Sequence, residues 1–148
     1  MILRALILGL ALIGGPAAGA DLVPYVVRDG AIDAPLAGTE PGDPARGLAL
    51  VSDMNNVSCL ICHVLPIADE PDMGEIGSPL DGIASRTGAG ELRLRLVDSK
   101  QIFPDTMMPS YYVVDGLVGV DAPYAGTPIY SAQQIEDVLA YLLTLEEM

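Results

Sequence analysis

Three residues near the middle of the chain have types and spacing that could do chemistry together. Cys59, Cys62 and His63 form the run Cys-Leu-Ile-Cys-His, and they are the only cysteines and the only histidine among 148 residues. Cys-x-x-Cys-His is the attachment signature of a c-type haem. The two thiols become thioethers on the haem vinyl groups, and a helical turn brings both sulfurs to one side of the ring. The histidine that follows then directs its imidazole at the iron.

Three other interpretations of this motif are weaker. A thioredoxin-like redox pair would need a βαβ context, which the sequence pattern does not show. A structural zinc site takes four ligands, and only Cys59, Cys62 and His63 are at hand. A disulfide between the two cysteines would close a very small loop and so stabilise little. The motif therefore predicts one covalently bound haem c.

A second axial ligand has to come from another residue type, because the chain has no second histidine. Methionine is the natural candidate, as in Met/His cytochromes. Four of the six methionines lie at a terminus, before the motif, or in an acidic loop soon after it: Met1, Met54, Met73 and Met148. Met107 and Met108 remain, in Pro104-Asp-Thr-Met-Met-Pro109. The flanking prolines favour an extended strap, in which one methionine could bind iron while the other packs.

Composition narrows the class of protein. There are 20 acidic and 7 basic residues, which gives a formal net charge of −13. A phosphate backbone would be repelled, so nucleic acid is excluded as a partner. With one Phe, six Tyr and no Trp, the core has few aromatic side chains unless a cofactor supplies apolar bulk.

The first twenty residues have the pattern of a secretory signal peptide. Arg4 is followed by an apolar stretch, and Ala18-Gly19-Ala20 is a small-residue cleavage site. The apolar stretch is shorter than a membrane span, so we expect cleavage after Ala20 and not an uncleaved anchor. The mature chain would have 128 residues and a charge of −14, with no membrane span. It would be exported to the periplasm.

The mature chain divides into an arm and a domain. Residues 21–40 contain proline and glycine without helical period, which predicts an extended arm, and residues 41–148 form the domain. Helices are expected at about 44–55, after the Asp43-Pro44 start signal, and around Glu91–Leu96. Residues 66–90 and 99–130 are expected to be loops. Ser131 and Gln134 form a capping-box pattern before an apolar stripe of Ile135, Val138, Leu139, Leu142 and Leu145. The fold class is all-α with long loops.

Residues from the first helix onward resemble class I cytochromes c. The resemblance rests on the Cys59–His63 motif, on Gly77-Ser-Pro-Leu-Asp-Gly82, on Gly82-Ile-Ala-Ser-Arg86 and on Met108-Pro109. It implies that the Pro79 carbonyl accepts the proton of the proximal histidine and that Arg86 contacts a haem propionate. It also implies Met108, and not Met107, as the distal iron ligand. The C-terminal helix is expected to cross the first helix near Gly47.

A narrower resemblance is to the SoxX family, the monohaem subunits of SoxAX cytochromes. It covers about residues 40–148, and its most specific stretch is Pro104-Asp-Thr-x-Met-Pro-Ser-Tyr-Tyr112. The family's complex is a periplasmic L-cysteine S-thiosulfotransferase, which joins thiosulfate oxidatively to a cysteine of a carrier protein. The resemblance implies a SoxA-type dihaem or monohaem partner that holds the catalytic haem, and a separate cytochrome as electron acceptor.

The residues agree with a relay role within such a heterodimer. Both cysteines would be used as thioethers, so none is left to hold a sulfur intermediate, and we expect no catalytic residue in this chain. A highly acidic chain also attracts a dianion such as thiosulfate poorly. One alternative is a free periplasmic monohaem cytochrome c that serves another oxidase or reductase. A further alternative is a haem-based sensor or enzyme with a labile distal ligand.

Overall fold

The computed structural model describes residues 22–147, and the expected signal segment lies outside this range. The described part is helical, with no β-strand and one isolated bridge between Arg28 and Ala31. Its α-helices are α1 (Pro44–Ser52), α2 (Ile83–Arg86), α3 (Ala89–Asp98) and α4 (Ala132–Leu142). Short 3₁₀ turns are η1 (Cys59–Ile61), η2 (Ser99–Gln101) and η3 (Ala122–Tyr124). None of the described helices has the length and apolarity to cross a membrane. The all-α prediction is confirmed.

Helix α1 begins at the predicted signal and ends earlier than predicted. The Asp43 carboxylate caps the helix by accepting from the backbone N–H groups of Ala45 and Arg46, and Pro44 occupies the first turn. The helix ends at Ser52 and not near residue 55. The Asp53 carboxylate accepts from the Asn55 backbone N–H at 3.1 Å, a local turn that competes with helical continuation.

Helix α4 is built as its sequence pattern predicts. Ser131 and Gln134 form a complete capping box, in which each side chain bonds the other's backbone N–H. The apolar stripe is buried, and its last member, Leu145, stays buried although the helix has ended at Leu142. This helix is the centre of the fold, since both α1 and α3 pack against it.

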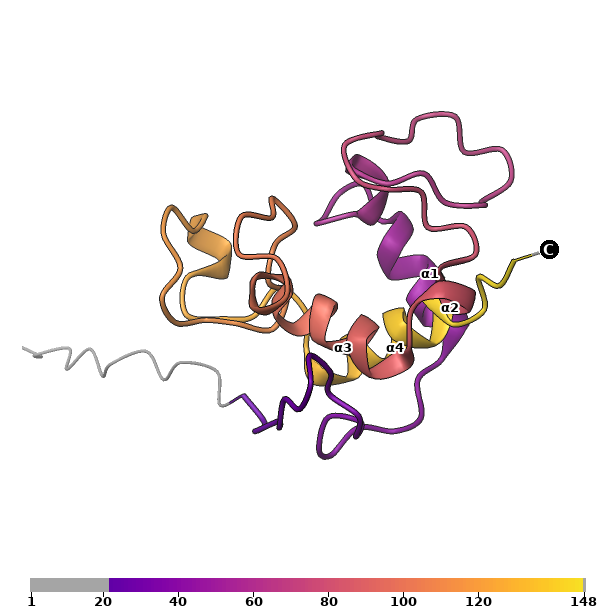
Figure 1. Ribbon diagram of the computed structural model, residues 1–148. Coiled ribbons are helices and arrows are strands. Elements are labelled where there is room, and N and C mark those ends of the chain that lie inside the picture. Colours follow the sequence, from indigo (N-terminus) through magenta and orange to yellow (C-terminus); the bar gives the residue numbers. More distant parts are fainter. Residues whose placement is uncertain (1–21, 148) are drawn as a thin grey trace, which may run out of the picture.

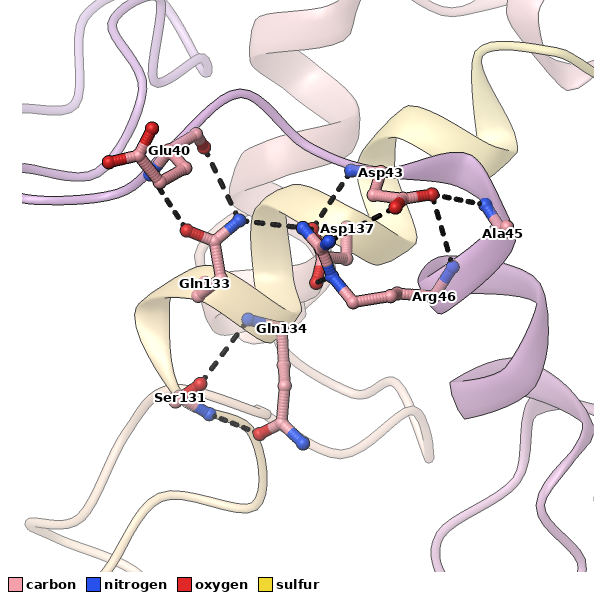
Figure 2. Close-up of polar contacts among 8 residues, drawn as sticks. All are labelled: Glu40, Asp43, Ala45, Arg46, Ser131, Gln133, Gln134 and Asp137. Atoms are coloured by element: carbon pink, nitrogen blue, oxygen red, sulfur yellow. Dashed lines mark hydrogen bonds and ion pairs between the residues drawn. The ribbon is translucent and has the colours of Figure 1, made fainter.

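The crossing of α1 and α4 depends on a residue without a side chain. A Cβ placed on Gly47 would overlap the Asp137 carbonyl and lie 2.8 Å from the Tyr141 Cβ. The predicted crossing near Gly47 is therefore confirmed. Beside it, the Arg46 guanidinium reaches across to Asp137, with Nε 2.7 Å from one carboxylate oxygen (Figure 2). The hydrogen bonds from Arg46 are the main cause of the low pKa of Asp137, about 2.

Helix α3 confirms the helical interpretation of residues 91–96. Alternate leucines at 92, 94 and 96 are all buried, because the helix is covered on more than one side. Arg93 between them is also buried, and its Nε lies 2.9 Å from a carboxylate oxygen of Glu136 in α4. A buried ion pair needs further hydrogen bonds to offset the loss of solvation, and the N-terminal arm supplies two of them. The Ile32 carbonyl accepts from Arg93, and the Leu36 N–H donates to Glu136.

Residues 22–40 contain no helix and lie against the helices. Ile32 and Leu36 are each 2% exposed. The Val23 N–H also donates to the Tyr112 hydroxyl at 3.0 Å. At its end, the Glu40 N–H donates to the Gln133 side chain at 2.8 Å (Figure 2).

Two long loops rise from the same side of the α3–α4 pair (Figure 1). One runs from η1 to α3 and contains the one-turn helix α2, where the sequence pattern predicts only loop. The turn before α2 has Gly82 at φ +61°, a conformation that suits glycine. The other loop runs from α3 to α4 and is irregular apart from η2 and η3. The residues that could do chemistry lie on these two loops.

Candidate functional site

The Cys-x-x-Cys-His segment is a tight turn attached to the end of α1. Ser58 caps η1 by accepting from the Leu60 N–H at 3.2 Å, and its hydroxyl donates to the Val51 carbonyl at 2.6 Å. The Cys59 carbonyl accepts from the N–H groups of both Cys62 and His63. Leu60 is fully buried and anchors the turn in the core. The backbone thus gathers the two cysteines and the histidine in one turn.

The thiols border an apolar environment. Burial raises the pKa of Cys59 to about 11, an effect that a hydrogen bond with Tyr111 partly offsets. The Tyr111 ring stacks on Tyr130, with ring centroids 4.9 Å apart and planes 12° apart. The Tyr130 hydroxyl in turn donates to the Val57 carbonyl at 3.0 Å. Residues around the first cysteine are therefore connected directly to the loop between α3 and α4, here called the distal loop.

The imidazole of His63 is oriented by the loop that follows it. Its Nδ1 lies 2.7 Å from the Ser78 carbonyl oxygen. A carbonyl only accepts hydrogen bonds, so Nδ1 carries the proton and Nε2 keeps a lone pair for a ligand. A Cβ placed on Gly77 would overlap the His63 ring, which explains why the residue beside the ring is a glycine.

The role expected of Pro79 falls to the preceding residue. The carbonyl that faces His63 belongs to Ser78, whereas the Pro79 carbonyl accepts from Arg86 at 2.6 Å. The loop closes on the motif through the Gly77 N–H, which donates to the Cys62 carbonyl at 2.7 Å. This short connection sets the register of the loop and brings the carbonyl one residue after Gly77 to the ring.

Arg86 is not among the residues that line the cavity beside the motif. Its guanidinium donates to the carbonyls of Pro79 and Asp81. In this position it holds together the loop that contains Ser78.

A cavity of about 440 Å³ opens beside the motif, within the size range of small-molecule and cofactor sites. One wall comes from the motif and the loop after it, and the other comes from α3 and the distal loop. The lining residues are Val57, Ser58, Cys59, Ile61, Cys62, His63, Ile76, Gly77, Ser78, Arg95, Ser99, Phe103, Thr106, Met107, Met108, Pro109 and Tyr111.

Both candidate methionines border this cavity, but they differ in exposure. Met107 is 76% exposed, whereas Met108 is partly buried against the core. The backbone of Met108 is also held in place: its carbonyl accepts from the Ser99 hydroxyl at 2.9 Å and from the Lys100 ammonium at 3.1 Å. Its N–H donates to the Thr106 hydroxyl at 3.2 Å. Of the two, Met108 is the one that the fold positions.

Sequence reasoning missed the cation of the cavity wall. Arg95 borders the cavity, forms an ion pair with Glu91 and lies over the Phe103 ring, 5.3 Å from the ring centre. The signal was present in the sequence, since Glu91 and Arg95 have the i, i+4 spacing of a helical ion pair. It was overlooked because the resemblance to class I cytochromes c assigned the propionate contact to Arg86.

A haem fits the donor set of this site. Two cysteines and a histidine with an available Nε2 lie on one wall, and two thioethers lie on the other. The cavity is lined mainly by apolar groups, which suits a flat macrocycle with polar groups at one edge. Cys59, Cys62 and His63 are brought together with Met108, whereas Pro79 and Arg86 lie outside the lining.

The fold and this arrangement define the class as a cytochrome c-like protein. No protein-family model and no curated protein matches the chain. Among solved structures, it is similar to a chain of the crystal structure of SoxXA from P. pantotrophus, with 37% sequence identity and a TM-score of 0.75. The match covers 83% of this chain and 95% of that chain. The chain therefore belongs to the family of this SoxXA chain, and its fold is that of a SoxX-like cytochrome.

Proposed function

We propose that this protein is the electron-transfer, monohaem c-type cytochrome subunit of a periplasmic SoxAX-type complex in thiosulfate oxidation. The observation that carries the proposal is the cavity that unites Cys59, Cys62 and His63 on one wall with Met108 on the other. The similarity to a SoxXA chain over most of both sequences supports the same assignment.

Four residues of the cavity have a role toward a bound haem. Cys59 and Cys62 attach it covalently, and His63, held by the Ser78 carbonyl, offers Nε2 to the iron. Met108 offers its thioether from the distal wall. The haem itself supplies an iron that gains and loses one electron. The chain keeps it in an apolar cavity and holds the ligands in place, so little rearrangement accompanies the change in charge.

Arg95 takes the role first expected of Arg86. Haem propionates add negative charge to an already acidic chain, and a partly buried carboxylate needs a cation and hydrogen bonds. Arg95 is the basic side chain on the cavity lining. Arg86 instead supports the Ser78 carbonyl indirectly, through its bonds to Pro79 and Asp81.

The chemistry of the chain favours relay over sulfur transfer. Its only two cysteines are assigned to haem attachment, so no third thiol could carry a sulfur intermediate. With a formal net charge of −13, the chain attracts thiosulfate poorly. Conjugation of thiosulfate to a carrier-protein cysteine is therefore assigned to a SoxA-type partner, and this chain passes the electrons on to an acceptor cytochrome.

Co-purification tests the proposal. The tagged full chain is expressed with the SoxA-type cytochrome of the same organism, and each purified subunit is weighed and stained for haem after denaturation. We expect a heterodimer in which this chain carries one haem that resists acid–acetone extraction. Purification of a haem-loaded chain without a partner would favour a free cytochrome c, and extractable haem would overturn the covalent site.

A further inference from the structure

The part of the distal loop between Pro109 and α4 has an apolar tip that does not pack into the core. Leu117, Val118 and Val120 lie within four residues, and Val118 is 98% exposed. Single exposed apolar residues are ordinary, but an apolar cluster at a loop tip is not, because tips are normally polar. Contiguous exposed apolar surface marks interaction sites.

Two glycines give this tip its shape. Gly116 and Gly119 have φ of +72° and +71°, so each makes a turn that other residues rarely adopt. They stand on either side of Leu117 and Val118, and a Cβ at either glycine would meet no atom within 4 Å. The glycines therefore serve backbone direction and not close packing, and together they present the two apolar side chains outward.

The base of the loop is fastened to the rest of the molecule. The Asp121 carboxylate caps η3, and the Tyr124 hydroxyl donates to the Asn56 side chain at 2.7 Å, close to the haem motif. Further along, Tyr130 stacks on Tyr111. The segment projects from the helices at the end of the molecule opposite the C-terminus (Figure 1). A fastened base with an outward apolar tip loses little conformational entropy on binding.

Charge identifies the kind of surface that fits this tip. Asp115 and Asp121 flank the apolar residues, and the sequence after Lys100 contains seven carboxylates and no basic residue. An anionic membrane would be repelled by these charges. A second copy of the chain would bring the same acidic border. The complementary surface is an apolar socket bordered by lysine or arginine on a different protein.

We propose that the tip formed by residues 116–120 docks into a cation-bordered apolar socket of the SoxA-type subunit. This inference rests on the proposed function, since it names the surface through which that heterodimer forms. One loop is smaller than a stable interface, so the tip acts as an anchor within a larger contact area. A few apolar anchors commonly carry most of the binding energy of an interface.

The test uses the haem-loaded full chain and the SoxA-type cytochrome of the same organism, with affinity measured by calorimetry. The variant is Val118→Asp, and the matched control is Val26→Asp, at an apolar position of the arm that is 63% exposed. We expect Val118→Asp to weaken binding about tenfold or more and Val26→Asp to leave it near wild type. The absorption spectrum and thermal midpoint of both variants should match wild type, because neither side chain is buried.

Four other outcomes would overturn the inference. If Val118→Asp binds like wild type, the tip is not the anchor, although the heterodimer stands. Equal weakening by Val26→Asp would mean that added charge and not the tip is responsible. If Val118→Asp instead abolishes self-association of the chain alone, or its binding to anionic vesicles, the occupant is a second copy or a membrane. If wild type does not bind the partner at all, the proposed function fails and the inference fails with it.

Discussion

The two walls of the cavity hold their candidate ligands in different ways. On the proximal wall, the ligand side chain itself is fixed: His63 Nδ1 bonds the Ser78 carbonyl, and Gly77 lies against the ring. On the distal wall, the fold fixes the backbone of Met108, whereas no hydrogen bond within residues 22–147 holds its thioether, as suits a weak acceptor. The protein preorganises the side chain of the candidate proximal ligand, whereas it fixes only the backbone of the candidate distal ligand.

The largest expected effect comes from disturbing the preorganised wall. Gly77→Ala places a methyl group where the His63 ring lies. Overpacking of this kind costs about 1–3 kcal/mol. We expect lower stability in urea unfolding and a lower yield of covalent haem. The control is Gly88→Ala, because a Cβ there meets nothing within 4 Å and the backbone is not left-handed. Equal behaviour of the two variants would show that the proximal wall is not tightly packed.

Removal of the proposed distal ligand should change the absorption spectrum more than the stability. We expect Met108→Ala to abolish the sulfur–iron charge-transfer absorption of the ferric protein while the haem stays covalently attached. Met107→Ala is the control and should keep the absorption, because its side chain is mainly exposed. Recording both ferric spectra decides the assignment. Loss of the band only in Met107→Ala would move the ligand by one residue.

The two arginines separate a role toward the haem from a role toward the proximal loop. Arg95→Gln removes a positive charge from the cavity wall. That charge destabilises ferric relative to ferrous haem, so its loss stabilises the ferric form. We expect a lower reduction potential by the equivalent of roughly 1 kcal/mol, the scale of a screened charge interaction at such distances. Arg86→Gln should lower the potential less, because that guanidinium is hydrogen-bonded to backbone carbonyls away from the cavity lining. Redox titration of both variants makes the comparison, and a larger shift in Arg86→Gln would restore the original assignment.

The smallest effect concerns the helical scaffold that supports both walls. The pKa of Asp137 is about 2 instead of 3.8, chiefly because Arg46 donates hydrogen bonds to it. A lowered pKa contributes stability that is fully present above the ordinary value and is lost as pH falls toward 2. Arg46→Ala should therefore reduce the fall in unfolding free energy between pH 4 and pH 2. Arg28→Ala, at an exposed position of the arm, serves as the control. An unchanged pH profile in Arg46→Ala would argue against this pairing.

Local sequence signals predicted the parts of the site and fold that depend on interactions between residues close in sequence. The Cys-x-x-Cys-His turn, the Asp43 cap and the Ser131 capping box each involve neighbours within a few residues. Which carbonyl meets His63 depends on the path of a fifteen-residue connection, and the prediction missed it by one position. The buried Arg93–Glu136 pair joins residues 43 apart, so no local pattern could reveal it.

The dependence of α1 on α4 has a consequence for the order in which the newly made chain can fold. Residues 36, 40 and 43 each hydrogen-bond a side chain of α4 that lies at least 93 positions later. Until that helix has been synthesised, the first helix and the arm lack the helix against which they pack. The cysteines and histidine of the motif lie between these two halves, so they stay reachable during that interval. We expect cofactor insertion to precede the final folding step, in which the arm and α1 pack against α4.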